Sequence, residues 1–354
     1  MTKLFADGDS GAERLRGLIQ GSIASGAFQS ACTLADCLLQ MGGSTASDVL
    51  LQSRCFFVGG EYNRSLAILE HEGLLSAQRV SEASEMLMPS GENENANESD
   101  VFSIDIRNQF LGLRAIQLAV KCLSSLEQLD DCINLLEPVL LLDTLDVSDS
   151  DGAFGERVER ARKVFEMMMR DSDPADGVNI VASMYAMAGK CYDLLENRPK
   201  AKVCLVASLR IDPTCVEAVD YLMSHGLISI PERRSLYTSL SQDGFAYSWL
   251  DSYYRLQLLD DFNAYKEGGG VSGVEVNKTG SPAEATGARG GEGSRVNHEE
   301  ASRGGIGSAM VLVRRAEKYF EKAYFSDAYR LARQAYIIDP FNETGLLVYV
   351  GSMV

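Results

Sequence analysis

Apolar and small side chains recur along residues 182–213 at spacings of three and four, with polar side chains between them. This spacing is typical of amphipathic helices. The positions with the clearest roles in packing are Tyr185, Gly189, Tyr192, Ala201, Leu205 and Pro213. Gly189 and Ala201 stand where a first helix would cross a second, and only small side chains let two backbones approach there. Because Pro213 cannot continue a helix, the pattern predicts a helical hairpin that ends at this proline.

The same pattern recurs in four other segments, which begin at Ala12, Ala46, Leu113 and Ala309. In the last segment the corresponding positions are Ala316, Tyr319, Ala328 and Pro340. A hairpin of this kind cannot bury its apolar face alone and must stack on neighbours. The spacing matches the W-x₂-L-G-x₂-Y…A-x₃-F…P pattern of tetratricopeptide repeats. The sequence therefore predicts an all-α superhelix of such repeats.

Two acidic interruptions and one glycine-rich interruption divide the predicted repeats. These are 81–102, 143–156 and 267–308, and they hold too few large apolar residues to offset the entropy of ordering, so we expect them to be disordered. The remaining segments are a flexible N-terminus (1–11), N-terminal repeats (12–80), a degenerate repeat (103–142), a block with the repeat 182–215 and irregular helical hairpins (157–266), and a repeat with a truncated following helix (309–354). The sequence leaves open whether the acidic stretches are phosphorylated.

Charge and composition argue against several classes of function. The formal net charge is −17 and no cluster of four basic residues exists, so we expect no nucleic-acid surface. No apolar run reaches the roughly 18 residues that a membrane helix needs. The N-terminus lacks the apolar core of a signal peptide, and we therefore expect an intracellular protein.

The residues that usually carry chemistry are few and dispersed. The eight cysteines form no C-x-x-C pair, and most fall within predicted helices, which favours small core side chains in a reducing compartment. The three histidines, His71, His225 and His298, lie far apart in the sequence. We therefore expect no catalytic, cofactor-binding or metal-binding residues, and we predict that the protein is not an enzyme.

Several blocks of the sequence resemble subunit 6 of the anaphase-promoting complex, the cyclosome. These blocks are 52–57, 62–64, 188–198, 224–225 and 316–320. Most of the repeat positions are generic, so the resemblance depends chiefly on Asp193, Asn197-Arg198 and Ser224-His225. It covers most of the chain in order, with the acidic and glycine-rich stretches as insertions.

The resemblance implies a non-catalytic scaffold of a cell-cycle ubiquitin ligase that acts in mitosis, in the nucleus and the cytoplasm. In that family the N-terminal repeats form a homodimer, and the scaffold bridges other tetratricopeptide, cullin-like and RING subunits. Its C-terminal repeats hold a small accessory subunit. This sequence ends at Val354, partway through what resembles the first helix of another repeat. A truncated fragment is one interpretation, and binding of the small subunit is then not expected.

Candidate residues for the homodimer are apolar side chains at helical spacing in the first two repeats. They are Leu15, Leu18, Ile19, Phe28, Leu34, Leu38, Leu50 and Phe57. Most of them must fill the core of their own repeat. Phe57 is the best candidate, because the adjacent Phe56 already takes a core position and the two cannot point the same way.

A generic tetratricopeptide adaptor, such as a co-chaperone, is the alternative function. It would need Lys, Asn and Arg side chains along its groove to hold a peptide carboxylate. The groove-facing positions Arg16, Gln20, Ala186 and Lys190 assemble no such clamp. A helical-repeat transferase is a third possibility, and it would need a metal or catalytic cluster that the sequence lacks.

Overall fold

The computed structural model describes residues 8–41, 45–87, 102–142, 153–171, 179–242, 245, 248–259 and 309–353. These ranges contain helices and turns but no strand, which confirms the predicted all-α fold. The chain divides into two compact units, Met1–Ser229 and Ile230–Val354, which are described separately. The glycine-rich segment 267–308 lies outside the described residues, as do 88–101 and 143–152 within the two acidic stretches.

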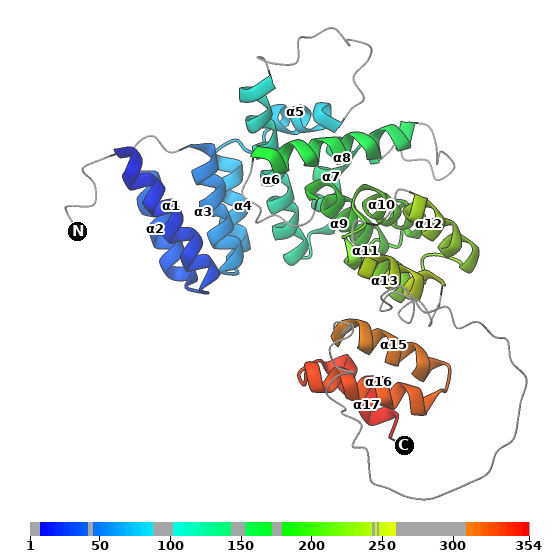
Figure 1. Cartoon of the computed structure of the whole chain (residues 1–354). Coiled ribbons are helices and arrows are strands. Elements are labelled where there is room, and N and C mark those ends of the chain that lie inside the picture. The colour runs from blue at the N-terminus through cyan, green and yellow to red at the C-terminus, as the bar shows by residue number, and fades with distance from the viewer. Residues whose placement is uncertain are drawn as a thin grey trace, which may run out of the picture. The chain divides into compact units, whose positions relative to one another are not determined.

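Four helical hairpins, each made of a first helix A and a second helix B, form the first unit (Figure 1). They are α1 (Gly8–Ala24) with α2 (Phe28–Gln40), α3 (Ala46–Val58) with α4 (Tyr62–His71), α6 (Phe102–Ser125) with α7 (Leu129–Leu140), and α9 (Ile180–Leu194) with α10 (Arg198–Ile211). Each hairpin packs on the next, and α11 (Val216–Ser224) packs on α9 and α10. The hairpins therefore form a solenoid in chain order.

The turn between the two helices has the same backbone conformation in every hairpin. A residue with positive φ stands at the fifteenth position of each predicted repeat: Gly26, Gly60, Glu127, Glu196 and, in the second unit, Ala323. In each case the next residue donates its N–H to a carbonyl five positions earlier, as Asn197 does to Tyr192 (2.8 Å). This left-handed cap satisfies the last carbonyls of helix A. The repeat positions assigned from the side-chain pattern thus coincide with the positions at which the backbone conformation repeats.

Small side chains occupy the crossings between helices A and B. A Cβ atom at Gly189 would lie 2.6 Å from Cγ of Leu205 and 3.1 Å from the carbonyl oxygen of Ala201, so only glycine fits without a shift. Ala201 is fully buried. In the second repeat the equivalent residues are Ser53 and Ser65, whose hydroxyls lie 2.7 Å apart and each bond to the other's backbone carbonyl. Two polar residues are tolerated there because they satisfy each other.

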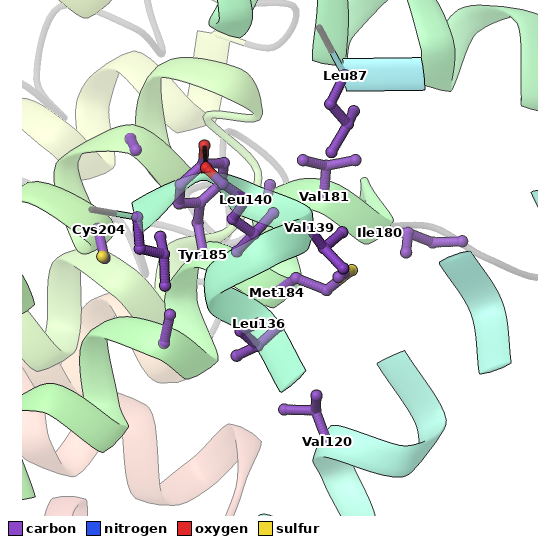
Figure 2. Close-up of a cluster of buried hydrophobic side chains, with 14 of the residues drawn as sticks. Leu87, Val120, Leu136, Val139, Leu140, Ile180, Val181, Met184, Tyr185 and Cys204 are labelled. Atoms are coloured by element: carbon purple, nitrogen blue, oxygen red, sulfur yellow. Dashed lines mark hydrogen bonds between the residues drawn. The ribbon is translucent and has the colours of Figure 1, made fainter. Parts of the chain in front are cut away.

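Aromatic residues of α9 join this helix to the preceding hairpin. Tyr185 is buried and donates its hydroxyl to the carbonyl of Leu140 (3.1 Å), while Tyr192 donates to Oε1 of Glu137 (2.9 Å). Figure 2 shows Tyr185 and Met184 facing side chains of α7. Pro213 is half-buried just beyond the end of α10, which is where the repeat pattern places it.

Two helices of the first unit lie outside the predicted hairpins. The first, α5 (Ala77–Leu87), packs on α6 and α7, and the second, α8 (Ala153–Asp171), packs on α5, α9 and α10. The prediction of disorder is therefore wrong for 81–87 and 153–156, as is that of a flexible N-terminus for 8–11, because these residues are helical. Burial of Ala83 and Leu87 in the main core stabilises α5 (Figure 2).

The second unit holds α12 (Ile230–Gln242), α13 (Ser248–Leu259), α15 (Ala309–Glu321), α16 (Phe325–Ile338) and α17 (Glu343–Gly351). The helices α12 and α13 pack together, and α15 packs on α16 and α17. Ala316 and Ala328 are fully buried at the crossing, Tyr319 is half-buried, and Pro340 is exposed beyond α16. A Cβ atom at Gly345 would lie 2.8 Å from Cγ2 of Val313, so α17 also approaches α15 closely.

Candidate protein-interaction surfaces

The first helices of the hairpins line a continuous groove in the first unit. A cavity of about 370 Å³ lies between α1, α3 and α6, and a second of about 610 Å³ lies between α3, α6, α9 and α11. Both are lined by Phe57, Gln117 and Lys121, so they form one surface, which we call the helix-A groove. All four positions expected to face the groove, Arg16, Gln20, Ala186 and Lys190, line it.

The helix-A groove carries more positive charge than the sequence suggested. Its cationic residues are Arg16, Arg54, Arg114, Lys121 and Lys190, and its acidic residues are Asp48 and Glu217. Of these five cations, Arg16 and Lys190 are groove-facing positions assigned from the sequence, whereas α3 and α6 contribute the other three, Arg54, Arg114 and Lys121. The sequence could have indicated these three cations as candidates, because they lie on the first helices of the second and third hairpins.

A half-buried ion pair joins α1 and α3 at one wall of the groove. Arg16 donates from Nε and Nη2 to the two carboxylate oxygens of Asp48 at 2.7 and 3.0 Å, and Asp48 is 2% exposed. Asp48 also accepts from the backbone N–H of Thr45 (2.9 Å), closing a capping box at the start of α3. Burial alone would raise the pKa of Asp48, but the hydrogen bonds from Arg16 and Thr45 outweigh it and lower that pKa.

At the other end of the groove a weaker pair joins α9 and α11. Nζ of Lys190 lies 3.2 Å from Oε2 of Glu217 and 5.9 Å from the ring centre of Tyr221. The side chain of Glu217 is 77% exposed, so water screens this pair. The pair therefore restrains Lys190 without removing its charge from the groove.

The two sequence blocks that carry the resemblance contact each other. Asp193, at the end of α9, accepts from the hydroxyl of Tyr221 (3.1 Å), and its Oδ2 lies 2.6 Å from Nδ1 of His225. Nη2 of Arg198 donates to the backbone carbonyl of His225 (2.6 Å), just beyond the end of α11. A cation there satisfies a carbonyl at the negative end of the helix dipole. Asp193, Arg198 and His225 therefore fix α11 against the α9–α10 hairpin.

The structure divides the candidate dimer residues into two groups. Leu15, Ile19 and Leu38 are buried in the core of the first repeats, which corrects their assignment to an interface, because a second copy cannot reach them. Leu18 is 53% exposed, and the rest are half-buried: Phe28, Leu34, Leu50 and Phe57. The ring of Phe57 packs on Tyr62 with centres 5.6 Å apart, and it also lines the groove.

Most of the cysteines lie in the hydrophobic core. Six cysteines are buried, among them Cys204, whose pKa burial raises to about 12, so its thiol stays protonated at neutral pH. Within the described ranges no group of three His, Cys, Asp or Glu side chains could hold a metal ion. In the same ranges no helix combines the length and apolar character needed to cross a membrane.

Together the hairpins, their crossings and the groove define a tetratricopeptide-repeat solenoid. No family model matches the chain. The chain is 24% identical over 245 residues to anaphase-promoting complex subunit 6 of Arabidopsis thaliana, covering 68% of this chain and 36% of that protein. It is 25% identical over 202 residues to cell division cycle protein 16 homolog of Mus musculus, covering 54% of this chain and 28% of that one. It thus spans about a third of the length of these relatives.

A solved structure supports the same fold. The crystal structure of the APC/C hetero-tetramer Cut9–Hcn1 superposes with a TM-score of 0.57 and covers 97% of this chain and 49% of the matched chain. At 18% identity this likeness shows the arrangement of helices alone. The chain resembles subunit 6 of the anaphase-promoting complex both in sequence, through the relatives above, and in fold.

Proposed function

We propose that the chain is a non-catalytic scaffold subunit of the anaphase-promoting complex, the ubiquitin ligase of cell division. The observation that carries the proposal is the resemblance to subunit 6, which extends over 68% of the chain. The contacts of His225 with Asp193 and Arg198 support it, because they join the two blocks on which the resemblance depends. In this role the solenoid bridges other tetratricopeptide, cullin-like and RING subunits, in the nucleus and the cytoplasm.

Affinity purification of the tagged full-length gene product from dividing cells tests the proposal. Mass spectrometry is expected to recover cullin-like and RING subunits together with other tetratricopeptide subunits. A tagged tetratricopeptide protein of unrelated function from the same cells controls for capture by repeats in general. Recovery of chaperones alone, or of the same partners as the control, would contradict membership of the complex.

Within this function we propose that the first two repeats form a homodimer. Leu18 supports the proposal, because it is 53% exposed in a helix whose other large apolar residues fill the core. It lies on a different face of α1 from Arg16 and Gln20, since positions two apart on a helix point about 200° from each other. Dimerisation through Leu18 therefore leaves the helix-A groove open.

A Leu18→Glu substitution is expected to convert a dimer to a monomer, because it places a charge in an apolar contact. Light scattering measures the mass, and circular dichroism checks that helicity is unchanged. Leu194→Glu is the matched control, since Leu194 is 61% exposed at the end of α9, outside the first two repeats. A native chain that is already monomeric, or a Leu18→Glu chain that remains a dimer, would refute this interface.

A repeat adaptor outside the anaphase-promoting complex is the second candidate function. The basic helix-A groove favours it, because adaptors of this fold need cations to hold an acidic ligand. The purification above separates the two candidates. An adaptor brings down partners that lack cullin-like and RING subunits.

A further inference from the structure

We propose that Cys132 of α7 and Cys191 of α9 are a site of reversible oxidation, at which a disulfide fastens the third hairpin to the fourth. Both thiols are free in the structure, and their side chains are in hydrogen-bond contact. The two residues are 0% and 1% exposed and belong to the same core cluster. The proposal rests on this pair of thiols, and it requires neither membership of the anaphase-promoting complex nor a homodimer.

The repeat pattern explains why the two thiols meet. Cys132 stands at the small-residue position of the third hairpin that Ala201 takes in the fourth. Cys191 lies on the face of α9 that packs on α7, beside Tyr192, whose hydroxyl reaches Glu137 of α7 (2.9 Å). Each unit of a solenoid contacts only its neighbours, so the joint between two hairpins is where the chain can flex. A covalent bond between α7 and α9 therefore restrains a joint that packing alone holds.

Other buried cysteines face an oxygen atom. Sγ of Cys122 donates to Oγ of Ser65 (3.3 Å), and Cys215 is in hydrogen-bond contact with Ser208. Two facing thiols differ from these, because their sulfurs need only move from contact to the bonding distance of about 2.05 Å. Cys132 also lies 3.6 Å from the carbonyl oxygen of Val120, measured from Sγ. A thiol is a weak donor, so little is lost when that contact breaks.

The contact between the thiols also decides which of them reacts first. The hydrogen bond that Cys132 donates lowers the pKa of Cys191, and the same bond, together with burial, raises the pKa of Cys132. Because the thiolate is the nucleophile, Cys191 is the sulfur that attacks an oxidant.

With hydrogen peroxide as the oxidant, the reaction has two steps. The thiolate of Cys191 attacks one oxygen, the O–O bond breaks as an S–O bond forms, and the departing hydroxide takes up a proton and leaves as water. The sulfur of Cys132, which gives up its proton, then attacks the sulfenic sulfur of Cys191, and a second water leaves as the S–S bond forms. The two thiols are thereby oxidised to a disulfide and the peroxide is reduced to two waters. An external dithiol restores both thiols by exchange.

The positions of the two residues along their helices allow an oxidant to reach them. Cys132 lies in the first turn of α7 and Cys191 in the last turn of α9. Asp131, the neighbour of Cys132 in sequence, is exposed, and Leu194, at the end of α9, is 61% exposed. Terminal turns open more readily than the centres of helices. Local opening therefore admits the oxidant, and the disulfide opposes further opening once it has formed.

The experiment oxidises the reduced full chain with hydrogen peroxide and then alkylates the remaining thiols. The chain carries Cys37→Ala, because the thiol of Cys37 is exposed and would link two copies. Digestion with trypsin and a glutamate-specific protease leaves each cysteine of the pair in a peptide without another cysteine. Mass spectrometry of the unreduced digest then identifies the linked peptides. Cys132→Ala and Cys191→Ala each remove one thiol of the pair, and Cys204→Ala is the matched control, since Cys204 is also 1% exposed.

The native pair is expected to appear as one linked peptide that dithiothreitol separates. Oxidation should raise the midpoint of thermal unfolding by about 5 °C or more, because the bond restrains the unfolded chain. It should also slow hydrogen exchange in α7 and α9. The Cys204→Ala chain should keep these changes, whereas Cys132→Ala and Cys191→Ala should lose them, with circular dichroism checking the fold of each.

Two results would overturn the proposal. One is a folded chain that yields the linked peptide only after denaturation, since the thiols would then be core side chains alone. The other is a rise in the unfolding midpoint that Cys191→Ala retains, since another pair of cysteines would then account for it. The first result depends on the native pair itself, so the proposal can fail even where a variant does not fold.

Discussion

The α9–α10 hairpin and the α15–α16 hairpin have the same repeat register but are covered very differently. Ten of the fifteen residues of α9 are buried, whereas three of the thirteen residues of α15 are. Both hairpins have a small–small crossing and a left-handed turn residue, Glu196 in one and Ala323 in the other. The difference therefore arises outside the hairpins: α6, α7, α8 and α11 pack on the first, while α17 packs on the second.

Exposed apolar side chains mark the less covered region. Ile337 is 72% exposed, Phe341 92% and Leu347 74%, all in or beside α16 and α17. In the first unit the equivalent surfaces are closed by the next hairpin. The comparison shows that the repeat pattern fixes how two helices of a hairpin cross, whereas the neighbours decide how much of the hairpin is buried.

Truncation of a leucine in each region gives the largest expected contrast. Leu205→Ala, at a fully buried position of α10, is expected to lower the free energy of unfolding by about 2–5 kcal/mol, because it removes apolar contacts and leaves a cavity. Leu347→Ala, at an exposed position of α17, should change it by about 0.5 kcal/mol or less. Urea denaturation measures the change, and hydrogen exchange assigns it to a hairpin. Equal losses would mean that α17 is covered as fully as α10.

The hairpins were predictable from the sequence because their crossings need small residues at fixed positions. Gly189 with Ala201 and Ala316 with Ala328 are examples. Most of α5 and the start of α8 were missed because both border acidic stretches, and the apolar stripe of α5 (Val80, Ala83 and Leu87) is short. In the folded chain these apolar residues join a core cluster with residues of α6, α7 and α9, and the sequence alone does not show that packing.

The candidate site was predictable only in part. Arg16, Gln20, Ala186 and Lys190 could be placed in the groove by their repeat positions. The contribution of Arg54, Arg114 and Lys121 could not be foreseen, since it depends on which faces of α3 and α6 remain open after the hairpins stack. The apolar periodicity of the sequence shows which face of a helix packs in the core. The stacking of the hairpins determines which of the remaining faces line the same groove.

Loss of an ion pair should also affect the two regions unequally. Asp48→Asn is expected to destabilise the chain by about 1–2 kcal/mol at neutral pH, less than for a fully buried pair because Arg16 retains access to water. Glu317→Gln breaks the pair with Arg314 on α15, where the more exposed partner is 35% accessible, and should cost about 0.5 kcal/mol or less.

The pH dependence distinguishes the two variants further. Because the pKa of Asp48 is lowered in the folded state, its stabilising effect is complete above its unfolded pKa of about 3.9 and is lost as the pH falls through the folded value. Asp48→Asn should therefore flatten the acid side of the stability curve, and Glu317→Gln should leave it steep. Urea denaturation across acid pH measures this, and parallel curves for Asp48→Asn and the native chain would contradict the role of the pair.

The smallest expected effect should be the same in both regions, because its cause is local. Ala323 and Glu196 adopt a left-handed backbone conformation that costs about 1 kcal/mol for a residue with a Cβ atom. Glycine removes that strain but loses more entropy on folding, so Ala323→Gly and Glu196→Gly should each stabilise by about 0.5 kcal/mol. Gly60→Ala, the reverse change at the same repeat position, should destabilise by about 1 kcal/mol. Thermal unfolding could instead show a gain in stability for Glu196→Gly but none for Ala323→Gly. The turn would then depend on neighbouring hairpins, and the backbone register of a hairpin would not be independent of its burial.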